Sequence, residues 1–437
     1  MLFSLPFTSL AGSYTNVTVP EAKSMIDSNP SLVVLDVRTQ TEYDSGHIGN
    51  AKLIPVTELE GRLDGLHTSD EILVYCRSGV RSATASQILA DNDFLYVHSM
   101  LGGIIAWIDA GYAVYVKYSS IQEAINNASE GDTIFVSSGT YYENVVVNKS
   151  VSLIGENKAT TIIDGNGTGN VVLVEGDDSV TVTEVTVRNG NNGFYILGFN
   201  HSIIGDVVTN NTYHGIELVG INNSVTENTV TDNWYGILLG GSSCNIISRN
   251  TLLSNQGGIN LDENCECNEI SENTLMDNVM GIGIVGSNNS VFGNTIKENW
   301  SGLEINGTNN TIYHNSFVNN TIQVYSGMLN NAWDNGCEGN YWSNYNGTDL
   351  DGDGIGDTEL PWEGVDYCPL MNPYWNPADV DHDLDVDLYD AVRLLVAYGS
   401  KIGDENYNCH CDINEPYGEI DLYDAVLLLV NYGKKYS

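Results

Sequence analysis

The chain has 437 residues, enough for about three domains, and its 57 acidic side chains stand against only 16 Lys and Arg, for a formal net charge of −41. Such a chain has little with which to neutralise phosphates, which argues strongly against nucleic-acid binding. The charge fits a secreted protein that binds cations or lives in salt, and the alternative is that it serves only solubility. No stretch reaches 18 uninterrupted apolar residues, so no membrane span is predicted.

The N-terminus and the glycosylation motifs favour an extracellular or cell-surface location. Residues 1–13 are apolar but short and lack a basic region, so they are expected to be a signal remnant or an N-terminal arm. Asn-X-Ser/Thr sequons are dense and favour a glycoprotein, although an Asn-rich repeat creates some by chance. The sequons begin at Asn16, Asn127, Asn148, Asn166, Asn200, Asn210, Asn222, Asn288, Asn299, Asn306, Asn309, Asn319 and Asn346.

Residues 14–116 alternate between two kinds of pattern. The runs "SLVVLDVR" and "EILVYC" are short and β-branched, which is typical of buried parallel strands. The segments "VPEAKSMIDS" and "RSATASQILADN" have helical patterns. This alternation predicts an α/β domain.

Three motifs in this segment resemble a single-domain rhodanese: "LDVRTQTEYDSGHIGNAKLIP", "CRSGVR" and "LGGIIAWIDAGYAV". In that family a cysteine takes up a sulfane sulfur as a persulfide and passes it to a nucleophile. The resemblance implies that Cys76 is this cysteine and that Cys76–Arg81 is the active loop. It also implies that the loop is braced by Asp36, Arg38 and Glu42 and closed by Gly102, Gly103 and Trp107.

The residues around Cys76 suit this chemistry on their own terms. A thiol needs a lowered pKa to be a nucleophile near neutral pH. A strand-to-helix loop aims backbone N–H groups at the sulfur, Arg77 and Arg81 add positive charge, and Gly79 allows a sharp turn. The alternative is an inactive rhodanese fold used as a binding module, because an oxidising exterior works against a free thiolate.

Residues 117–374 contain a repeat of about 21 to 23 residues, which is the range of solenoid proteins. The repeated phrases include "SVTENTVTDNWYGILL", "NIISRNTLLSNQGGIN" and "SVFGNTIKENWSGLEI". Single coils are too small to bury their own apolar side chains, so stacked coils must share one core. We therefore expect a right-handed parallel β-helix with asparagine ladders at its turns and a helix at its N-terminal end.

This segment resembles the repeat β-helices grouped with carbohydrate-binding proteins and sugar hydrolases, including the periplasmic NosD type, through "GDTIFVSSGTYYENVVVNKSVSLIG" and "GNYWSNYNGTDLDGDGIGD". The resemblance implies the fold and leaves the activity open. No glycosidase or lyase site is expected, because the candidate carboxylates read as turn residues. Some relatives carry a copper label, but no His, Met and Cys cluster with ligand spacing occurs, so no copper site is expected. Carbohydrate binding remains an alternative, with Trp234 and Trp300 at equivalent places in the repeat.

The eight cysteines suggest disulfides in the later part of the chain. Cys244 and Cys267 occupy equivalent places in consecutive coils, at a spacing within the Cα range of a disulfide, and are predicted to pair. A bond between Cys337 and Cys368 is a second prediction. Cys409 and Cys411 are candidates for tethering the C-terminal segment.

The phrase "DLDGDGIGD" places alternating carboxylates around glycines, a pattern that wraps oxygen ligands around Ca²⁺. The alternative is an acidic turn. The predicted ligands are Asp349, Asp351, Asp353 and Asp357.

Residues 375–437 are a duplicated loop and helix, with "DLYDAVRLLVAYG" recurring as "DLYDAVLLLVNYG". The first loop has acidic residues at EF-hand positions, although Leu384 stands where glycine is usual. Its predicted ligands are Asp379, Asp381, Asp383, Asp385, Asp387 and Asp390. The second loop has one inserted residue, and its predicted ligands are Asp412, Asn414, Asp421 and Asp424.

This duplication resembles a type I dockerin, a module that binds two Ca²⁺ ions and docks onto a cohesin. The resemblance implies that the partner surface includes Leu388, Tyr389, Leu422 and Tyr423. The alternative is a calcium-stabilised module packed on its own β-helix.

The chain is thus expected to be a multidomain protein with a rhodanese-like α/β domain, a parallel β-helix and a small α-helical EF-hand-like module. The favoured function is a secreted, calcium-binding scaffold of archaeal or bacterial type, which forms filaments head to tail with copies of itself or docks onto a cohesin-like surface protein. The second hypothesis is a secreted sulfurtransferase that uses a Cys76 persulfide, and the third is a glycan-binding β-helix.

Overall fold

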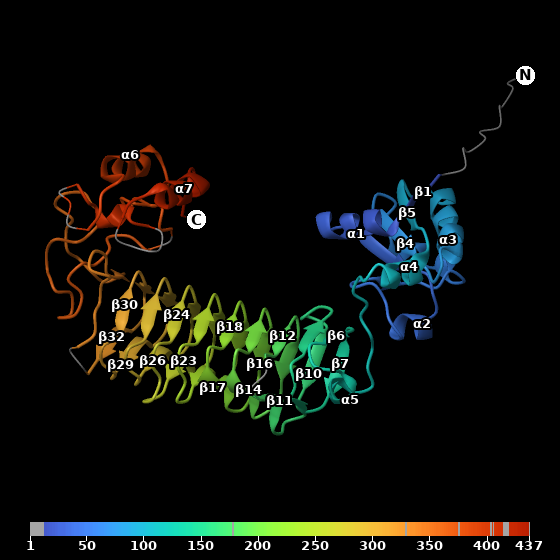
Figure 1. Ribbon diagram of the computed structural model, residues 1–437, viewed down its shortest axis with the longest axis horizontal. Helices are drawn as coiled ribbons and strands as arrows, with labels where there is room; N and C mark the ends of the chain where they lie inside the picture. The colour runs from blue at the N-terminus through green and yellow to red at the C-terminus, as the bar shows by residue number, and fades with distance from the viewer. Residues whose placement is uncertain are drawn as a thin grey trace, which may run out of the picture. The chain divides into compact units, whose positions relative to one another are not determined.

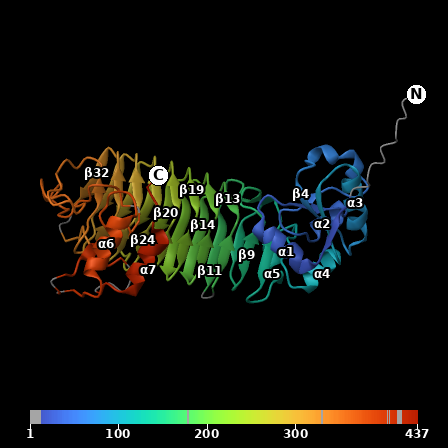
Figure 2. The ribbon, with the colours of Figure 1, turned by 90° about the horizontal axis from the view of Figure 1, so that it is seen from above.

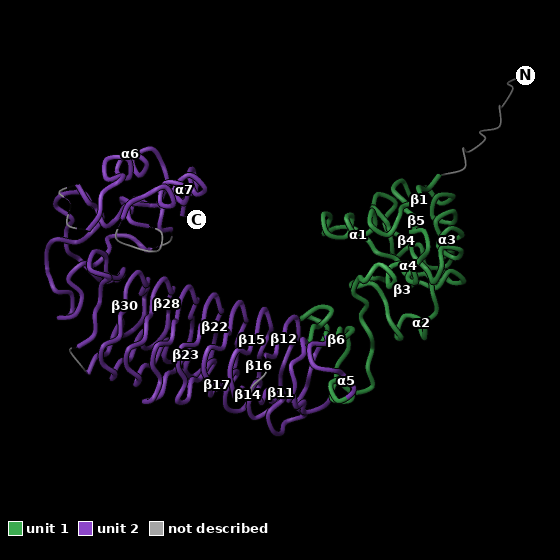
Figure 3. Tube along the Cα trace, viewed as in Figure 1, with its two compact units in different colours: residues 1–126, 133–141, 153–161 green, residues 127–132, 142–152, 162–437 purple. Residues whose placement is uncertain are grey.

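The computed structural model describes residues 13–176, 179–327, 330–374, 376–402, 404, 406–413 and 419–436. The chain separates into two compact units, shown in Figure 3. Unit 1 comprises residues 1–126, 133–141 and 153–161, and unit 2 comprises residues 127–132, 142–152 and 162–437. Among the described residues, no helix has the length and apolar character needed to cross a membrane.

Unit 1 is built on a five-stranded parallel sheet of order β1-β5-β4-β2-β3, flanked by helices (Figure 1). Its elements are β1 (Thr15–Val17), α1 (Val19–Ser28), β2 (Val33–Asp36), α2 (Gln40–Asp44), β3 (Lys52–Leu53), η1 (Leu59–Gly61), η2 (Leu63–Gly65), β4 (Glu71–Tyr75), α3 (Val80–Asp91), β5 (Tyr96–Met100) and α4 (Gly103–Asp109). This is the predicted rhodanese-like α/β fold.

The central strand β4 is buried on both faces, as its apolar run predicts. Ile72 and Val74 pack into one core, whereas Leu73 and Tyr75 pack into the other. The strand therefore ends between two rigid layers, which places Cys76 at the carboxyl edge of the sheet.

The start of the repeat region is joined to the rhodanese-like domain within unit 1. Here lie α5 (Ile121–Asn127), β6 (Thr133–Val136), β7 (Gly139–Tyr142) and β9 (Ser152–Gly155). The buried carboxylate of Glu156 accepts from the backbone N–H groups of Asn50 and Ser138 and lies 3.0 Å from Nε2 of His47. Burial raises the pKa of Glu156, but His47 and the N–H donors lower it by more, so that the pKa falls to about 2. The carboxylate thus anchors a rhodanese loop to the first coil.

Unit 2 is a right-handed parallel β-solenoid whose three sheets run along its length (Figure 2). The first sheet contains β10 (Thr161–Asp164), β13 (Thr186–Arg188), β16 (Val207–Thr209), β19 (Thr229–Thr231), β22 (Thr251–Leu253), β25 (Thr274–Met276), β28 (Thr295–Lys297), β31 (Ser316–Val318) and β33 (Tyr341–Trp342). The second contains β8 (Val145–Val147), β11 (Asn170–Gly176), β14 (Asn192–Phe199), β17 (His214–Ile221), β20 (Tyr235–Leu239), β23 (Gly257–Leu261), β26 (Met280–Ile284), β29 (Ser301–Ile305) and β32 (Ile322–Ser326). The third contains β12 (Thr181–Thr183), β15 (Ser202–Ile204), β18 (Ser224–Thr226), β21 (Ile246–Ser248), β24 (Glu269–Ser271), β27 (Ser290–Phe292) and β30 (Thr311–Tyr313).

Buried asparagines form the predicted ladders between coils. In one ladder the backbone N–H of each asparagine donates to Oδ1 of its equivalent in the next coil, as from Asn250 to Asn273 at 2.9 Å. An aspartate stands at each end, since Val185 donates to Asp206 and Asn340 donates to Asp366. The rungs in order are Asp206, Asn228, Asn250, Asn273, Asn294, Asn315, Asn340 and Asp366.

One of the sequons, that at Asn299, lies within such a ladder. Asn299 belongs to a second ladder, in which its side-chain amide donates to Asn320 and to backbone carbonyls. It is buried, so a glycan could not be attached to the folded chain.

The C-terminal module contains the two predicted helices, α6 (Leu388–Ala397) and α7 (Leu422–Asn431), with η3 (Cys409–Cys411) between them. Both helices begin with an aspartate capping box, and their apolar faces share a core that includes Leu394 and Leu428. The helices are confirmed, whereas the dockerin assignment stays a prediction.

The disulfide found in the structure matches neither predicted pair, although it tethers the C-terminal segment through Cys409, one of the two candidates for that role. Cys337 pairs with Cys409, across a sequence separation of 72, and not with Cys368. Cys244 and Cys267 are both free. Their Cα spacing suits a disulfide, but equivalent side chains of stacked coils point the same way, so their Cβ atoms stay about 4.8 Å apart, beyond the usual 3.5–4.5 Å.

Candidate functional site

The Cys76 thiol lies in a tight loop between β4 and α3. Gly79 takes a φ of 98°, in the left-handed region, which turns the chain from strand to helix within four residues. Its backbone N–H donates to Sγ of Cys76 at 3.2 Å. The cysteine side chain is buried at the base of the loop.

The loop favours the thiolate form of Cys76. Burial raises the pKa of this thiol, but backbone N–H groups of the loop and of the first turn of α3 lower it by more, and the pKa falls below its ordinary value. These N–H groups belong to Ser82, Ser78 and Gly79. The hydroxyl of Ser82 lies 3.8 Å from Sγ and supports the same shift. A thiolate cradled by N–H donors is a nucleophile at neutral pH.

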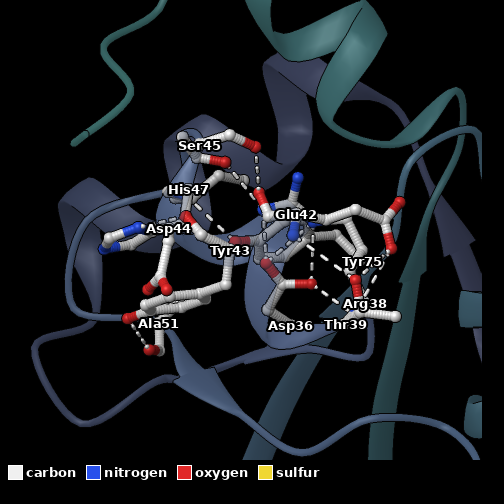
Figure 4. Close-up of polar contacts among 12 residues, drawn as sticks. Asp36, Arg38, Thr39, Glu42, Tyr43, Asp44, Ser45, His47, Ala51 and Tyr75 are labelled. Carbon is white, nitrogen blue, oxygen red and sulfur yellow. Dashed lines mark hydrogen bonds and ion pairs between the residues drawn. The ribbon is translucent and has the colours of Figure 1, made fainter. Parts of the chain in front are cut away.

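Arg81, the last residue of the loop, forms a two-pronged ion pair with Glu42. The guanidinium nitrogens lie 2.7 and 2.6 Å from the two carboxylate oxygens. This contact lowers the pKa of Glu42 to about 2. Glu42 also caps α2 through Thr39, so the ion pair ties the active loop to a fixed helix end (Figure 4). Arg77, in contrast, is exposed on the loop.

Asp36 and Arg38 brace the loop from below, as the family motif implies. Their buried ion pair has Nη2 of Arg38 2.6 Å from the Asp36 carboxylate, and Nη2 also donates to the carbonyl of Gly46 (Figure 4). The neighbouring Tyr75 hydroxyl accepts from the N–H of Ile48. These contacts fix the ends of β2 and β4 beside Cys76. Asp36 and Arg38 do not themselves contact the sulfur.

Gly103 closes the loop from the other side. The N–H of the next residue, Ile104, donates to the carbonyl of Cys76 at 2.8 Å. A Cβ at Gly103 would lie 2.4 Å from that carbonyl oxygen, and its φ is 58°. Only glycine fits this contact.

The first predicted calcium loop is partly assembled. Carboxylate oxygens of Asp349, Asp351 and Asp353 lie within 4.8 Å of one another. The Asp353 carboxylate raises the pKa of Asp351, which is the effect of crowding like charges. Asp357 instead accepts from the N–H of Leu350.

The structure brings together half of the predicted ligands of the second calcium loop. Oxygens of Asp379, Asp381 and Asp383 lie within 4.8 Å of one another. The other three have different partners: Asp385 pairs with Lys435, Asp387 caps α6, and the buried Asp390 accepts from the N–H groups of Val380 and Asp387.

The third predicted loop is not assembled in the part of the chain that the structure describes. Asp412 accepts from the Tyr407 hydroxyl, Asp424 from the N–H of Ile413, and Asp421 caps α7. Asn414 lies outside the described residues.

Sequence reasoning missed a cluster in unit 2. His314, His382 and His410 surround the buried carboxylate of Glu338. The sequence has no His, Met and Cys cluster with ligand spacing, and these residues meet only in the folded chain. The four residues come from four separate segments, and no local motif marks them.

Comparisons with known proteins agree with this architecture. Residues 18–110 match the rhodanese-like domain family, and residues 125–347 match the family described as periplasmic copper-binding protein (NosD). A periplasmic family is consistent with an envelope or extracellular location.

The curated relatives match through the rhodanese-like domain. Thiosulfate sulfurtransferase 18 of Arabidopsis thaliana is 30% identical over 125 residues, 25% of this chain and 90% of that protein. Thiosulfate sulfurtransferase GlpE of Coxiella burnetii is 30% identical over 94 residues, 22% of this chain and 87% of that protein. The chain spans a smaller share of some other relatives, as with 52% of the putative sulfur carrier protein YrkF of Bacillus subtilis.

Two solved structures are similar to parts of this chain. A rhodanese-related protein from Thermoplasma volcanium is 32% identical, covers 24% of this chain and all of its own, and has a TM-score of 0.22. An alginate lyase from Paenibacillus is 13% identical, covers 49% of this chain and 92% of its own, and has a TM-score of 0.41. Over residues 125–347 the chain belongs to the NosD family, and over residues 18–110 it belongs to the rhodanese-like family.

Proposed function

We propose that the chain is a sulfurtransferase of the cell envelope or exterior that carries a sulfane sulfur on Cys76. The observation that supports this most is the loop itself, in which a free, buried thiol with a lowered pKa accepts from a backbone N–H. Relatives named as thiosulfate sulfurtransferases cover nearly their whole length with this domain, which supports the same chemistry.

The two half-reactions balance without an outside oxidant. The Cys76 thiolate attacks the outer sulfur of a sulfane donor such as thiosulfate, a new S–S bond forms, and sulfite leaves with the electrons of the broken S–S bond. An acceptor nucleophile then attacks the outer sulfur of the persulfide, and the Cys76 thiolate leaves. The loop N–H groups hold the negative sulfur before and after each step.

The test is transfer from thiosulfate to cyanide, with thiocyanate as the measured product. We expect wild-type protein to form thiocyanate and Cys76→Ser to lose the activity. Cys244→Ser removes an exposed free thiol elsewhere and is the matched control, which should keep full activity. Wild-type protein that forms no thiocyanate, or a Cys76→Ser variant as active as wild type, would overturn the proposal.

A calcium-binding scaffold is the second candidate, favoured by the two acidic groups around Asp351 and Asp381. A divalent cation offsets the repulsion between crowded carboxylates, and Ca²⁺ takes six to eight oxygen ligands. The exposed side chains of Tyr389 and Tyr423 support docking of the module onto a second copy or a surface protein. We expect Ca²⁺ to raise the melting temperature of the module, Asp383→Asn to remove the effect and Asp385→Asn to keep it. No Ca²⁺-dependent shift in wild type would refute this candidate.

The NosD family description raises the question of copper. The histidine and glutamate cluster fits Cu²⁺ or Zn²⁺ by its imidazole and carboxylate donors, and it does not resemble a sulfur-rich Cu⁺ site. Two of its four residues, His382 and His410, lie outside the segment that matches the family. The family name therefore supports a metal ion for this chain without accounting for the donors.

A further inference from the structure

The cluster combines residues from the end of the solenoid with residues from the C-terminal module, all within unit 2. His314 follows β30, and Glu338 lies in the loop before β33. His382 lies in the loop before α6, and His410 is in η3. None of them belongs to the Cys76 site.

The ring nitrogens converge on the Glu338 carboxylate. Nε2 of His314 lies 2.5 Å from Oε2, while Nδ1 of His410 and Nε2 of His382 lie 2.5 and 3.3 Å from Oε1. In a tetrahedral zinc site with bonds of about 2.0–2.1 Å, neighbouring ligand atoms are about 3.3 Å apart. The ligand atoms of Glu338, His382 and His410 all lie within 4.8 Å of one another, a small adjustment from a coordination shell, and His314 joins them through Glu338.

The contact between His410 and Glu338 is a hydrogen bond, but hydrogen bonding does not account for the other two histidines. The Nε2 atoms of His314 and His382 are buried, and neither has a partner with hydrogen-bond geometry, although both lie close to the carboxylate. Buried polar atoms left without a hydrogen bond cost free energy, and each needs an explanation such as an ion. His382 is 6% exposed, so water does not provide the missing partner readily.

The space between the rings suits one ion. A cavity of about 30 Å³ is lined by the four cluster residues and by neighbours that include Tyr374. That volume holds one water-sized particle. The Tyr374 ring stacks on His314 at 4.0 Å, which fixes the plane of the imidazole.

We propose that His314, Glu338, His382 and His410 bind one divalent transition-metal ion, Zn²⁺ or Cu²⁺. Three imidazole nitrogens and one carboxylate oxygen are donors that both ions accept, whereas Ca²⁺ and Mg²⁺ prefer oxygen alone. Because the ligands come from both the solenoid end and the C-terminal module, the ion joins the two. The acidic loops beside it remain available to Ca²⁺.

The test uses the full chain without a histidine tag, stripped with a chelator and held in excess Ca²⁺ so that the acidic loops are filled. Zn²⁺ and Cu²⁺ are added separately, and bound metal is measured by elemental analysis after dialysis. We expect one equivalent per chain, and a loss of affinity of about 100-fold or more in His410→Ala and in Glu338→Gln. The exposed His67, in the rhodanese-like domain, supplies the control His67→Ala, which should bind as wild type does.

A spectroscopic measurement on wild type keeps the proposal testable if a variant fails to fold. The electron paramagnetic resonance spectrum of the Cu²⁺-loaded chain should show hyperfine coupling to imidazole nitrogen, and loading should slow hydrogen exchange in η3. Wild-type protein that retains no metal, cluster variants that bind as tightly as His67→Ala, or a Cu²⁺ spectrum without nitrogen coupling would each overturn the proposal.

Discussion

The Cys76 loop and the histidine cluster are two kinds of site made by one chain. The Cys76 loop is continuous: its N–H donors lie within six residues of the sulfur, between one strand and one helix. The cluster is discontinuous, because His314 and His410 are brought together only after the solenoid has formed and the C-terminal module has docked on it. The Cys76 loop should therefore tolerate substitutions elsewhere in the chain, whereas the histidine cluster should depend on contacts between distant segments.

The two sites also need opposite states of their cysteines. Cys76 must stay a free thiol to accept sulfur, while Cys337 and Cys409 form a disulfide beside His410, with Cys337 Sγ 3.6 Å from Nδ1 of that ring. Burial of Cys76 at the base of its loop protects the thiol from a second cysteine, which is how both states can coexist.

The largest expected effect is on the discontinuous site. Replacing Cys337 and Cys409 by Ser opens a link across 72 residues and should destabilise the C-terminal module by about 4 kcal/mol. Hydrogen exchange of α6 and α7 is the measurement, and thiocyanate formation at Cys76 should not change. The control is Cys244→Ser with Cys267→Ser, a pair of exposed free cysteines. Equal exchange in both double variants would show that the module is held without the disulfide.

The next effect is on the continuous site. Gly103→Ala places a methyl group 2.4 Å from the Cys76 carbonyl oxygen and should destabilise the rhodanese-like domain by about 3 kcal/mol, with loss of sulfur transfer. Gly111→Ala is matched in φ, at 77°, but has no atom within 4 Å, and should cost only about 1 kcal/mol. Metal content should stay as in wild type. Full activity of Gly103→Ala would mean that the loop does not need this close contact.

The smallest effect is a pH dependence within the Cys76 site. The folded pKa of Glu42, about 2, lies below its ordinary value of 4.5, so the pair with Arg81 stabilises the domain above pH 4.5 and loses that contribution as pH falls through 2. The pair is about one-third exposed, so we expect Glu42→Gln to cost about 1 kcal/mol at pH 7 and progressively less below pH 4.

Urea unfolding at several pH values, followed by hydrogen exchange of α2 and α3, measures this difference. The matched control is Glu58→Gln, which breaks a more exposed pair with Arg62 and should cost almost nothing. A cost for Glu42→Gln that is the same at pH 3 and pH 7 would contradict the argument.

What could be predicted from sequence follows the same division. The strand, loop and helix around Cys76 are local, and the coils of the solenoid repeat, so both are visible as patterns in the chain. Asp385, Asp387 and Asp390 were predicted as ligands from their spacing, yet they serve as an ion-pair partner, a helix cap and a backbone acceptor. Spacing could not separate these roles, because aspartate is also a preferred N-cap residue.

The histidine cluster and the true disulfide could not be predicted for a different reason. His382 and His410 meet Glu338 only because the chain after β33 returns to the last coils. The length and path of that return are not encoded in any periodic pattern. Cys337 and Cys409 are likewise paired by this return and not by register.

The asparagine ladder has a consequence for how such a chain can change its length. Each rung bonds to the rungs before and after it, as Asn273 does with Asn250 and Asn294, and to a backbone carbonyl of the preceding coil, as Asn273 does with Ile247. Duplicating or deleting a whole coil between Asp206 and Asp366 would therefore leave every bond of the ladder made. The two aspartates are different, since Asp366 also accepts from the Trp342 indole and from the N–H of Cys368. Gene duplication can therefore add interior coils without breaking the ladder, whereas the coils at its two ends cannot be duplicated in this way.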